Sequence, residues 1–530
     1  MTRAIADTEA GPVEGIPCRD RSVTVFRGIP YAAPPVGDLR WRPPRPPRRW
    51  EGVRRADRFG PMCPQAPNEA AATGVDVPMS EDCLSLNIWT GAPSREERRP
   101  VLVWIYGGGF REGTGAQPRY DGENLAGQGV LVVTFNYRLG AFGFLAAPEL
   151  GAESEHGSSG NYGLLDCVAA LRWVRDNIAG FGGDPDRVTI AGQSAGAGLV
   201  NFLAMSPLAK GLFHRAIAQS HARYCRDPEL RYLSTSYRLR ADAESAGSQY
   251  LRVHGARTVR ELRALDWHKL IDGHDPIDTS VETGGAAGPP MLRPVVDGWA
   301  IPAGYHETYA QGLQNDIDYL AGNNLDEAGA VPRNLVDALR TGRRTTRPGS
   351  PPVQVTLEQH RAAAQRKFGA LAEEFLRLYP ATTDDEAAEA SSRAARDNSR
   401  LSTYLWGVDW ARHSARSLHT YFWTHRSKAE GSGPRGACHG SEIDYVFGNP
   451  AGGTGSWTEE DHEIARTVSG YWTNFVATGD PNGAGLPRWQ PFSKDVGSVM
   501  EIGEHFRPIN VADPEHTRFW LRFFETQQAW

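Results

Sequence analysis

The sequence predicts an α/β fold in which helices cover both faces of a large, mostly parallel central sheet. Short apolar runs of strand length alternate with segments of helical periodicity between residues 87 and 203, a pattern typical of parallel strands joined by crossover helices. The chain has 530 residues, of which 40% are hydrophobic. It can therefore bury a core of the size that such a sheet requires.

The elements follow from local composition. Proline and arginine dominate residues 28–50, so we expect irregular backbone or short strands there, because proline cannot continue a helix. Strand-type apolar runs occupy residues 87–89, 101–106 and 130–137. Residues 161–178 repeat leucine, valine and isoleucine near helical spacing, which predicts a helix. Further along, the Ala- and Glu-rich residues 357–405 also favour helices.

Residues 188–198 read VTIAGQSAGAG and contain the most informative motif of the chain. A β-branched run precedes G-x-S-x-G, and a helix-like apolar run begins at Leu199. Small residues two positions on either side of the serine let a strand and a helix pass closely, and the turn between them is strained. The serine hydroxyl then lies at a helix N-terminus, which favours developing negative charge. Ser194 is the candidate nucleophile.

A serine nucleophile needs a base and an orienting acid. When the serine lies in a strand–turn–helix motif of this kind, the acid follows it in the chain and the histidine follows the acid. An apolar strand end runs into a Gly/Asn-rich turn that presents Asp326 and Glu327. His439 lies in a glycine-flanked loop, and His425 follows an aromatic run. Spacing alone does not choose among the 15 histidines or between the two acids.

The oxyanion hole requires backbone N–H groups aimed at one point. Residues 101–110 read VLVWIYGGGF, a strand-type run that ends in three glycines. Glycine lets the backbone approach a substrate oxygen with no side chain in the way. Gly108, Gly109 and Ala195 are the predicted donors, although a glycine triplet is equally typical of an ordinary turn.

The bulk properties exclude several classes of partner. The net charge is −6 and no cluster of Lys or Arg forms a basic face, so we expect no nucleic acid partner. No apolar run approaches the length of a membrane span. The first 15 residues are charged and lack an apolar segment, so we expect no signal peptide and a cytoplasmic location. The six cysteines show no metal-ligand spacing, so we expect no metal.

Besides the motif at Ser194, further recognisable motifs occur along nearly the whole chain, at residues 26–37, 80–88, 104–110, 136–138, 160–166, 181–185, 439–448 and 478–482. Together they resemble the type-B carboxylesterases, which include cholinesterases and para-nitrobenzyl-esterase-like bacterial enzymes. The resemblance implies the α/β-hydrolase fold and a single domain over residues 1–530. It also implies that insertions at about 222–290 and 335–410 cover the site.

Carried over to this chain, the resemblance makes Ser194 the nucleophile, His439 the base and Glu327 the acid, with Asp326 as the alternative acid. It also pairs Cys63 with Cys83 in a disulfide. Such a bond would contribute roughly 3 kcal/mol to folding stability, although a reducing cytoplasm disfavours its formation.

Three departures from the family pattern concern substrate choice. Gln193 precedes the nucleophile where the family usually has a glutamate. Residues 64–82 contain no aromatic side chain, whereas cholinesterases carry a tryptophan for the quaternary ammonium in this loop. Residues 220–223 read SHAR where a Ser-Gly pair is common. The first two departures predict poor hydrolysis of choline esters.

The resulting hypothesis is a serine carboxylesterase that hydrolyses neutral small-molecule esters through an acyl-enzyme and needs no cofactor. Within the enzymes, the alternatives are a lipase and an aromatic-ester or amide hydrolase acting on larger substrates. Outside them, the alternative is a non-catalytic adhesion or scaffold protein, because this fold also hosts such relatives.

Overall fold

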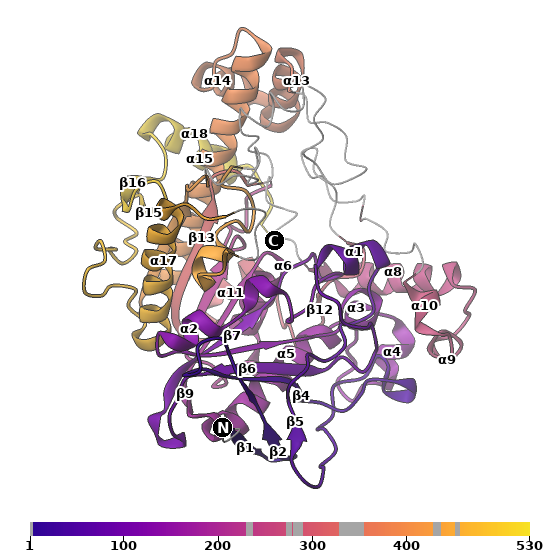
Figure 1. The fold of residues 1–530 in the computed structure, drawn as a ribbon. Helices are drawn as coiled ribbons and strands as arrows, with labels where there is room; N and C mark the ends of the chain where they lie inside the picture. Colours follow the sequence, from indigo (N-terminus) through magenta and orange to yellow (C-terminus); the bar gives the residue numbers. More distant parts are fainter. Residues whose placement is uncertain are drawn as a thin grey trace.

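An eleven-stranded sheet organises the chain (Figure 1). The computed structural model describes residues 4–228, 237–271, 278, 290–327, 355–427, 436–450 and 456–529. In sheet order, the strands are β16 (Arg507–Asn510), β15 (Ser498–Ile502), β14 (Leu418–Trp423), β13 (Asp318–Asn324), β10 (Arg215–Gln219), β9 (Gly183–Gln193), β7 (Arg99–Ile105), β8 (Leu131–Phe135), β6 (Ser85–Thr90), β4 (Thr24–Pro30) and β3 (Ile16–Pro17).

The centre of this sheet is parallel. Strands β15, β14, β13, β10, β9, β7 and β8 pair in parallel with their neighbours, whereas β16, β6, β4 and β3 are antiparallel. The mostly parallel sheet that the sequence predicts is confirmed. Two small sheets accompany it, one of β1 (Ile5–Thr8), β2 (Gly11–Glu14) and β5 (Arg54–Arg55), the other of β11 (Arg238–Leu239) and β12 (Val295–Val296).

Helices cover both faces of the large sheet (Figure 1). α2 (Glu123–Gly127) and α17 (Glu459–Thr478) pack against one face, and α5 (Tyr162–Asn177), α6 (Ala195–Met205) and α15 (Asp384–Ala411) against the other. The remaining helices are α1 (Pro67–Ala72), α3 (Gly140–Phe144), α4 (Pro148–Glu153), α8 (Arg240–Val253), α9 (Val259–Arg263), α10 (Trp267–Leu270), α11 (Tyr305–Gln311), α13 (Leu357–Phe368), α14 (Ala372–Leu378), α16 (Ile443–Phe447) and α18 (Pro514–Glu525).

The sequence-based elements are recovered with shifted ends. The predicted helix at 161–178 is α5, and residues 357–405 form α13, α14 and most of α15. α6 begins at Ala195, four residues before the apolar run that suggested it. Gly196 suits this early start, because a Cβ atom there would overlap the Ile105 carbonyl oxygen of β7.

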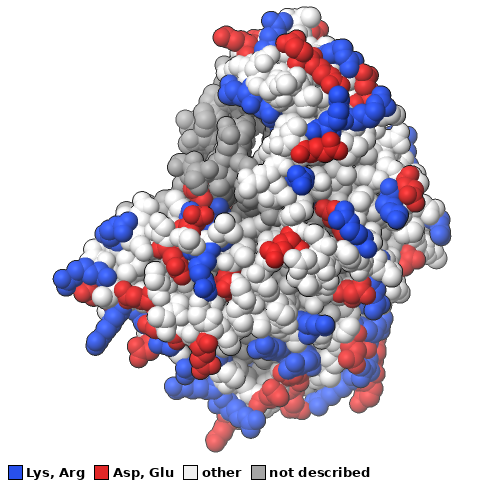
Figure 2. Space-filling model, turned by 180° about the vertical axis from the view of Figure 1, so that it is seen from behind, with Lys and Arg blue, Asp and Glu red and all other residues white. Residues whose placement is uncertain are grey.

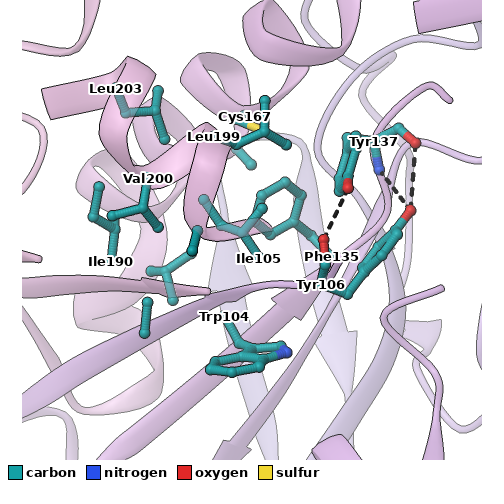
Figure 3. Packing of buried hydrophobic residues seen from close by; sticks show 14 of the residues in the cluster. Trp104, Ile105, Tyr106, Phe135, Tyr137, Cys167, Ile190, Leu199, Val200 and Leu203 are labelled. Atoms are coloured by element: carbon teal, nitrogen blue, oxygen red, sulfur yellow. Dashed lines mark hydrogen bonds between the residues drawn. The ribbon is translucent and has the colours of Figure 1, made fainter. Parts of the chain in front are cut away.

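The core beneath the glycine triplet fixes the end of β7 (Figure 3). The rings of Tyr106 and Tyr137 stack with centroids 4.6 Å apart, and the Tyr137 hydroxyl donates to the Tyr106 carbonyl at 2.8 Å. The same core contains buried apolar side chains of β9 and α6, such as Ile190, Leu199 and Leu203, which lie to one side of the tyrosine pair in this view. Each such side chain contributes about 1.5–3 kcal/mol on burial, so the backbone that leads into the triplet is held firmly.

Charged side chains are mixed on the face drawn in Figure 2, where Lys and Arg alternate with Asp and Glu over most of the described surface. This distribution agrees with the small net charge of −6. Within the described ranges, the helices are all too short or too polar to cross a bilayer.

Candidate active site

Ser194 occupies the sharp turn between β9 and α6. Its backbone has φ 59° and ψ −127°, a conformation that few non-glycine residues adopt. A Cβ atom at Gly192 would lie 2.6 Å from the Gly196 carbonyl carbon, so only glycine fits there. The Ser194 N–H donates to the Gln219 carbonyl of β10 at 2.9 Å. The turn is therefore anchored to the neighbouring strand.

His439 and Glu327 form a hydrogen-bonded pair. His439 Nδ1 lies 2.7 Å from Glu327 Oε2, although the two residues are 112 positions apart in the chain. Glu327 follows the carboxyl end of β13 and is 4% exposed, and its Oε1 accepts the Asn324 N–H at 3.1 Å. The His439 side chain is 37% exposed. A carboxylate thus orients the imidazole, and the opposite edge of the ring stays accessible.

The charges of this pair reinforce each other. Burial acts to raise the pKa of Glu327, but the charge and hydrogen bond of His439 and the charge of Arg223 outweigh it and lower the pKa to about 2. Burial acts to lower the pKa of His439, and the Glu327 carboxylate outweighs it and raises that pKa above its usual value. At neutral pH, Glu327 is ionised and ready to stabilise an imidazolium.

Asp326, the alternative acid, faces away from His439. Its carboxylate accepts from Arg396 Nη2 at 2.7 Å, from Arg426 at 3.2 Å and from the Ala437 N–H at 2.9 Å. These bonds tie the turn after β13 to the loop that carries His439. In the described structure, Asp326 anchors this loop and Glu327 contacts the imidazole.

His425, the alternative base, belongs to a different buried cluster. Its Nε2 lies 2.8 Å from Asp461 Oδ1, which also accepts from the Tyr445 hydroxyl at 2.5 Å. His425 is 4% exposed. These contacts assign it to the packing between the end of β14 and α17.

Sequence reasoning missed a polar network behind the acid–base pair. Glu442, three residues after His439, is buried and accepts from Gln219 Nε2 at 2.9 Å and from Asn324 Nδ2 at 2.5 Å. Asn324 Nδ2 also donates to the Cys438 carbonyl at 2.7 Å. Burial raises the pKa of Glu442. The only signal in the sequence was the position of Glu442 within the loop that resembles the family's histidine loop.

The glycine triplet after β7 adopts the conformation that its composition suggests. Gly108 has φ +115° and Gly109 has φ +61°, and a Cβ atom at Gly108 would overlap the Glu112 carbonyl. The N–H groups of Arg111 and Glu112 both donate to the Gly108 carbonyl at 3.1 Å. Ala195 is the first residue of α6, so its N–H has no carbonyl within the helix to bond.

Gln193 contacts the catalytic edge of the imidazole. Its Nε2 lies 3.1 Å from His439 Nε2. Because Nδ1 donates its proton to Glu327, Nε2 carries the lone pair, and the Gln193 amide donates to it. This lone pair is the one that a base at this position would use to accept a serine proton. Gln193 therefore stabilises the neutral imidazole.

The substitution Gln193→Glu is expected to move the acid limb of the pH profile of kcat/KM upward by about one pH unit. A carboxylate beside Nε2 favours the imidazolium, and the base works only when neutral, so activity is lost at a higher pH as the pH falls. Rate measurements from pH 5 to 9 test this, with Gln193→Met as the uncharged control. An unchanged acid limb in Gln193→Glu would contradict the assignment.

Cys63 and Cys83 lie together as buried free thiols. A hydrogen bond with Cys63, followed by burial, raises the pKa of the Cys83 thiol, and the Cys63 sulfur accepts the Leu139 N–H at 3.3 Å. The two sulfurs are thus neighbours, as the resemblance implies, and the disulfide itself stays a prediction.

No three His, Cys, Asp or Glu side chains gather into a metal-binding group in the described part of the chain. The six residues that the sequence singles out for the reaction lie around the carboxyl ends of β7, β9 and β13: Ser194, His439, Glu327, Gly108, Gly109 and Ala195. This edge is where ligands bind in open α/β sheets.

Comparisons with known proteins agree with this geometry. The model of the carboxylesterase family matches residues 2–520. The fumonisin B1 esterase of Sphingopyxis macrogoltabida is 37% identical over 515 residues, covering 94% of this chain and 86% of that protein. The para-nitrobenzyl esterase of Bacillus subtilis is 32% identical and covers 97% of both chains.

A solved structure of a PNB esterase superposes with a TM-score of 0.76 at 30% identity, and covers 98% of this chain and 100% of that one. The chain belongs to the carboxylesterase family and is a carboxylic ester hydrolase with the α/β-hydrolase fold.

Proposed function

We propose that this enzyme hydrolyses esters through a Ser194–His439–Glu327 triad. The observation that carries the proposal is the 2.7 Å contact between His439 Nδ1 and Glu327 Oε2, which leaves Nε2 as the proton acceptor. Ser194 supports it, because its strained turn follows β9, which only β10 separates from β13 in the sheet.

In the proposed reaction, Ser194 Oγ attacks the ester carbonyl while His439 Nε2 takes the hydroxyl proton. The imidazolium is stabilised by ionised Glu327, and it then protonates the leaving alcohol. The acyl group remains on Ser194. Water repeats the sequence with the same base, releases the acid and restores the serine.

The N–H groups of Gly108, Gly109 and Ala195 are proposed to bind the oxyanion of each tetrahedral intermediate. Positive φ angles at the two glycines and the open N-terminus of α6 support this assignment. One donor of this kind is worth about 10²–10³ in kcat. A burst of p-nitrophenol followed by a slower steady state would reveal the acyl-enzyme, whereas a strictly single-step progress curve under rapid mixing would weaken the proposal.

The substrates are proposed to be neutral carboxylic esters of small molecules. Relatives of this chain are named fumonisin B1 esterase, phenmedipham hydrolase and para-nitrobenzyl esterase, so the likeness favours ester chemistry without selecting one acyl or alcohol group. Lipase activity and aromatic-ester or amide hydrolysis are the alternatives. A panel of p-nitrophenyl esters from acetate to palmitate separates lipase from esterase by the acyl length with the highest kcat/KM.

Butyrylcholine is expected to give a kcat/KM about tenfold below that of 3,3-dimethylbutyl butyrate, its neutral isostere. Gln193 supplies no carboxylate beside Ser194, and residues 64–82 supply no aromatic ring, so the cost of desolvating the ammonium is not offset. The substitution Gln193→Glu should reduce the difference in kcat/KM between the two esters. A clear preference of the unmodified enzyme for the choline ester would contradict this expectation.

We also propose that residues 1–530 form one hydrolase domain whose insertions at about 222–290 and 335–410 cover the site. The described parts of these insertions include α8, α9 and α10 in the first and α13, α14 and α15 in the second. Residues 229–236, 272–277, 279–289 and 328–354 lie outside the described residues. A cytoplasmic location and the absence of a nucleic acid partner stay predictions from the sequence.

A further inference from the structure

His221 is a buried imidazole in the loop after β10, close to the proposed triad. It is 2% exposed, and neither ring nitrogen has a hydrogen-bond partner among the residues that the structure describes. Buried polar groups are nearly always paired, and an unpaired one costs about 1–3 kcal/mol. A bound molecule that reaches this ring and bonds to it would remove that cost.

The loop after β10 places this ring. Gln219, the last residue of β10, accepts the Ser194 N–H, and the Ser220 N–H donates to the Gly322 carbonyl at 2.7 Å. Ser220 has φ +61°, which turns the chain sharply after the strand. The His221 carbonyl then accepts from Asn201 Nδ2 at 3.2 Å. The backbone of His221 is thus fixed between the triad strands and α6.

The ring lies against the first turn of α6, and Phe110, which follows the glycine triplet, approaches the same point of that turn. A Cβ atom at Gly198, in the first turn of α6, would lie 3.1 Å from His221 Nε2 and 3.2 Å from Phe110 Cζ. Phe110 directly follows Gly109. When an ester carbonyl binds at the proposed oxyanion donors, its carbonyl carbon also carries the acyl chain. The acyl chain therefore starts close to the imidazole.

The chemistry of the two nitrogens indicates the kind of partner. Burial, and to a smaller extent the charges of Arg223 and His439, lowers the pKa of His221 to about 3, so the ring is neutral at working pH. A neutral imidazole offers one donor and one acceptor. A hydroxyl group can bond to either nitrogen, whereas a carboxylate would add a negative charge beside ionised Glu327.

We propose that His221 is a specificity-determining residue that selects acyl groups bearing a hydroxyl close to the ester carbonyl. This rests on the proposed triad, because it uses the orientation of an acyl group bound to Ser194. The ring accepts from or donates to the substrate hydroxyl, and the substrate thereby supplies a partner that the described residues do not provide. The preferred substrates are then esters of small hydroxy acids.

The test compares kcat/KM for p-nitrophenyl 3-hydroxybutyrate and p-nitrophenyl butyrate. The unmodified enzyme should favour the hydroxy ester by about tenfold, the value of one hydrogen bond of ordinary strength. His221→Phe keeps a ring and removes both nitrogens, so the ratio should fall to about one. His221→Asn, which retains a donor and an acceptor, should recover part of the preference. Ser248→Ala on α8 is the matched control and should keep the full ratio.

Several results would overturn the proposal. One is a kcat/KM ratio near one in the unmodified enzyme, which would mean that the His221 nitrogens bond only to water. Another is a ratio that remains unchanged in His221→Phe. A third is a higher kcat/KM for mono-p-nitrophenyl succinate than for p-nitrophenyl 3-hydroxybutyrate that is abolished in Arg223→Met. This result would assign the acyl contact to Arg223, whose Nε and Nη2 are also unpartnered among the described residues. If His221→Phe does not fold, the His221→Asn ratio and a His221→Gln ratio decide. Butyrate hydrolysis that persists in Ser194→Ala would instead refute the triad.

Discussion

Replacing Ser194 with alanine is expected to lower kcat for p-nitrophenyl butyrate by about 10⁶, the loss found when the nucleophile of another serine hydrolase is removed. Alanine removes the attacking oxygen and keeps the small side chain that the turn between β9 and α6 accepts. The hydrogen bond from the N–H of residue 194 to the Gln219 carbonyl joins backbone atoms, so it should remain in the variant. Steady-state rates at matched enzyme concentration measure the effect.

Two controls accompany this variant. Circular dichroism and the melting temperature should match those of the unmodified enzyme, because no buried contact of the Ser194 side chain is lost. Ser248→Ala, whose hydroxyl donates to the Glu244 carbonyl within α8, should retain activity. Turnover by Ser194→Ala within a hundredfold of the unmodified enzyme would refute Ser194 as the nucleophile.

Glu327→Gln is expected to lower kcat by about 10⁴, as the loss of the acid does in another triad. The amide keeps the shape of the carboxylate but cannot stabilise the imidazolium. Glu327 raises the pKa of His439, so its neutralisation should lower that pKa. The acid limb of the residual activity should therefore move to lower pH, and rates between pH 5 and 9 test both effects.

Asp326→Asn is the matched comparison, since it makes the same change one residue earlier. Asp326 accepts from Arg396, Arg426 and the Ala437 N–H, so its neutralisation should cost about 1–3 kcal/mol of folding stability. Its kcat should fall by less than tenfold. If Asp326→Asn lost more activity than Glu327→Gln, the two acids would exchange roles.

The part of the site that local sequence encodes was predictable. The turn around Ser194 depends on glycines within two residues of it, and the triplet at Gly108 depends on one strand end. Both are short-range features that sterics dictate. The strand and helix positions follow similarly from periodicity, with ends displaced because packing against neighbours, as at α6, extends an element beyond its apolar run.

The long-range contacts were not predictable from residue patterns. Gln219, Asn324 and Glu442 meet only because β10, β13 and the His439 loop converge at one edge of the sheet. The choice of Glu327 over Asp326 depended on the resemblance, since either side chain suits a turn after a strand. The contact of Gln193 with His439 and the position of the His221 ring required three dimensions, because the residues next to them lie on other elements.

Active-site labelling tests the central claim most directly. A fluorophosphonate reacts covalently with a serine that an adjacent base has activated. Intact-mass and peptide analysis after stoichiometric inhibition should find one adduct, located on Ser194, and Ser194→Ala should remain unlabelled. An adduct on another serine that abolishes ester hydrolysis, or full activity after complete labelling of Ser194, would contradict the proposed mechanism.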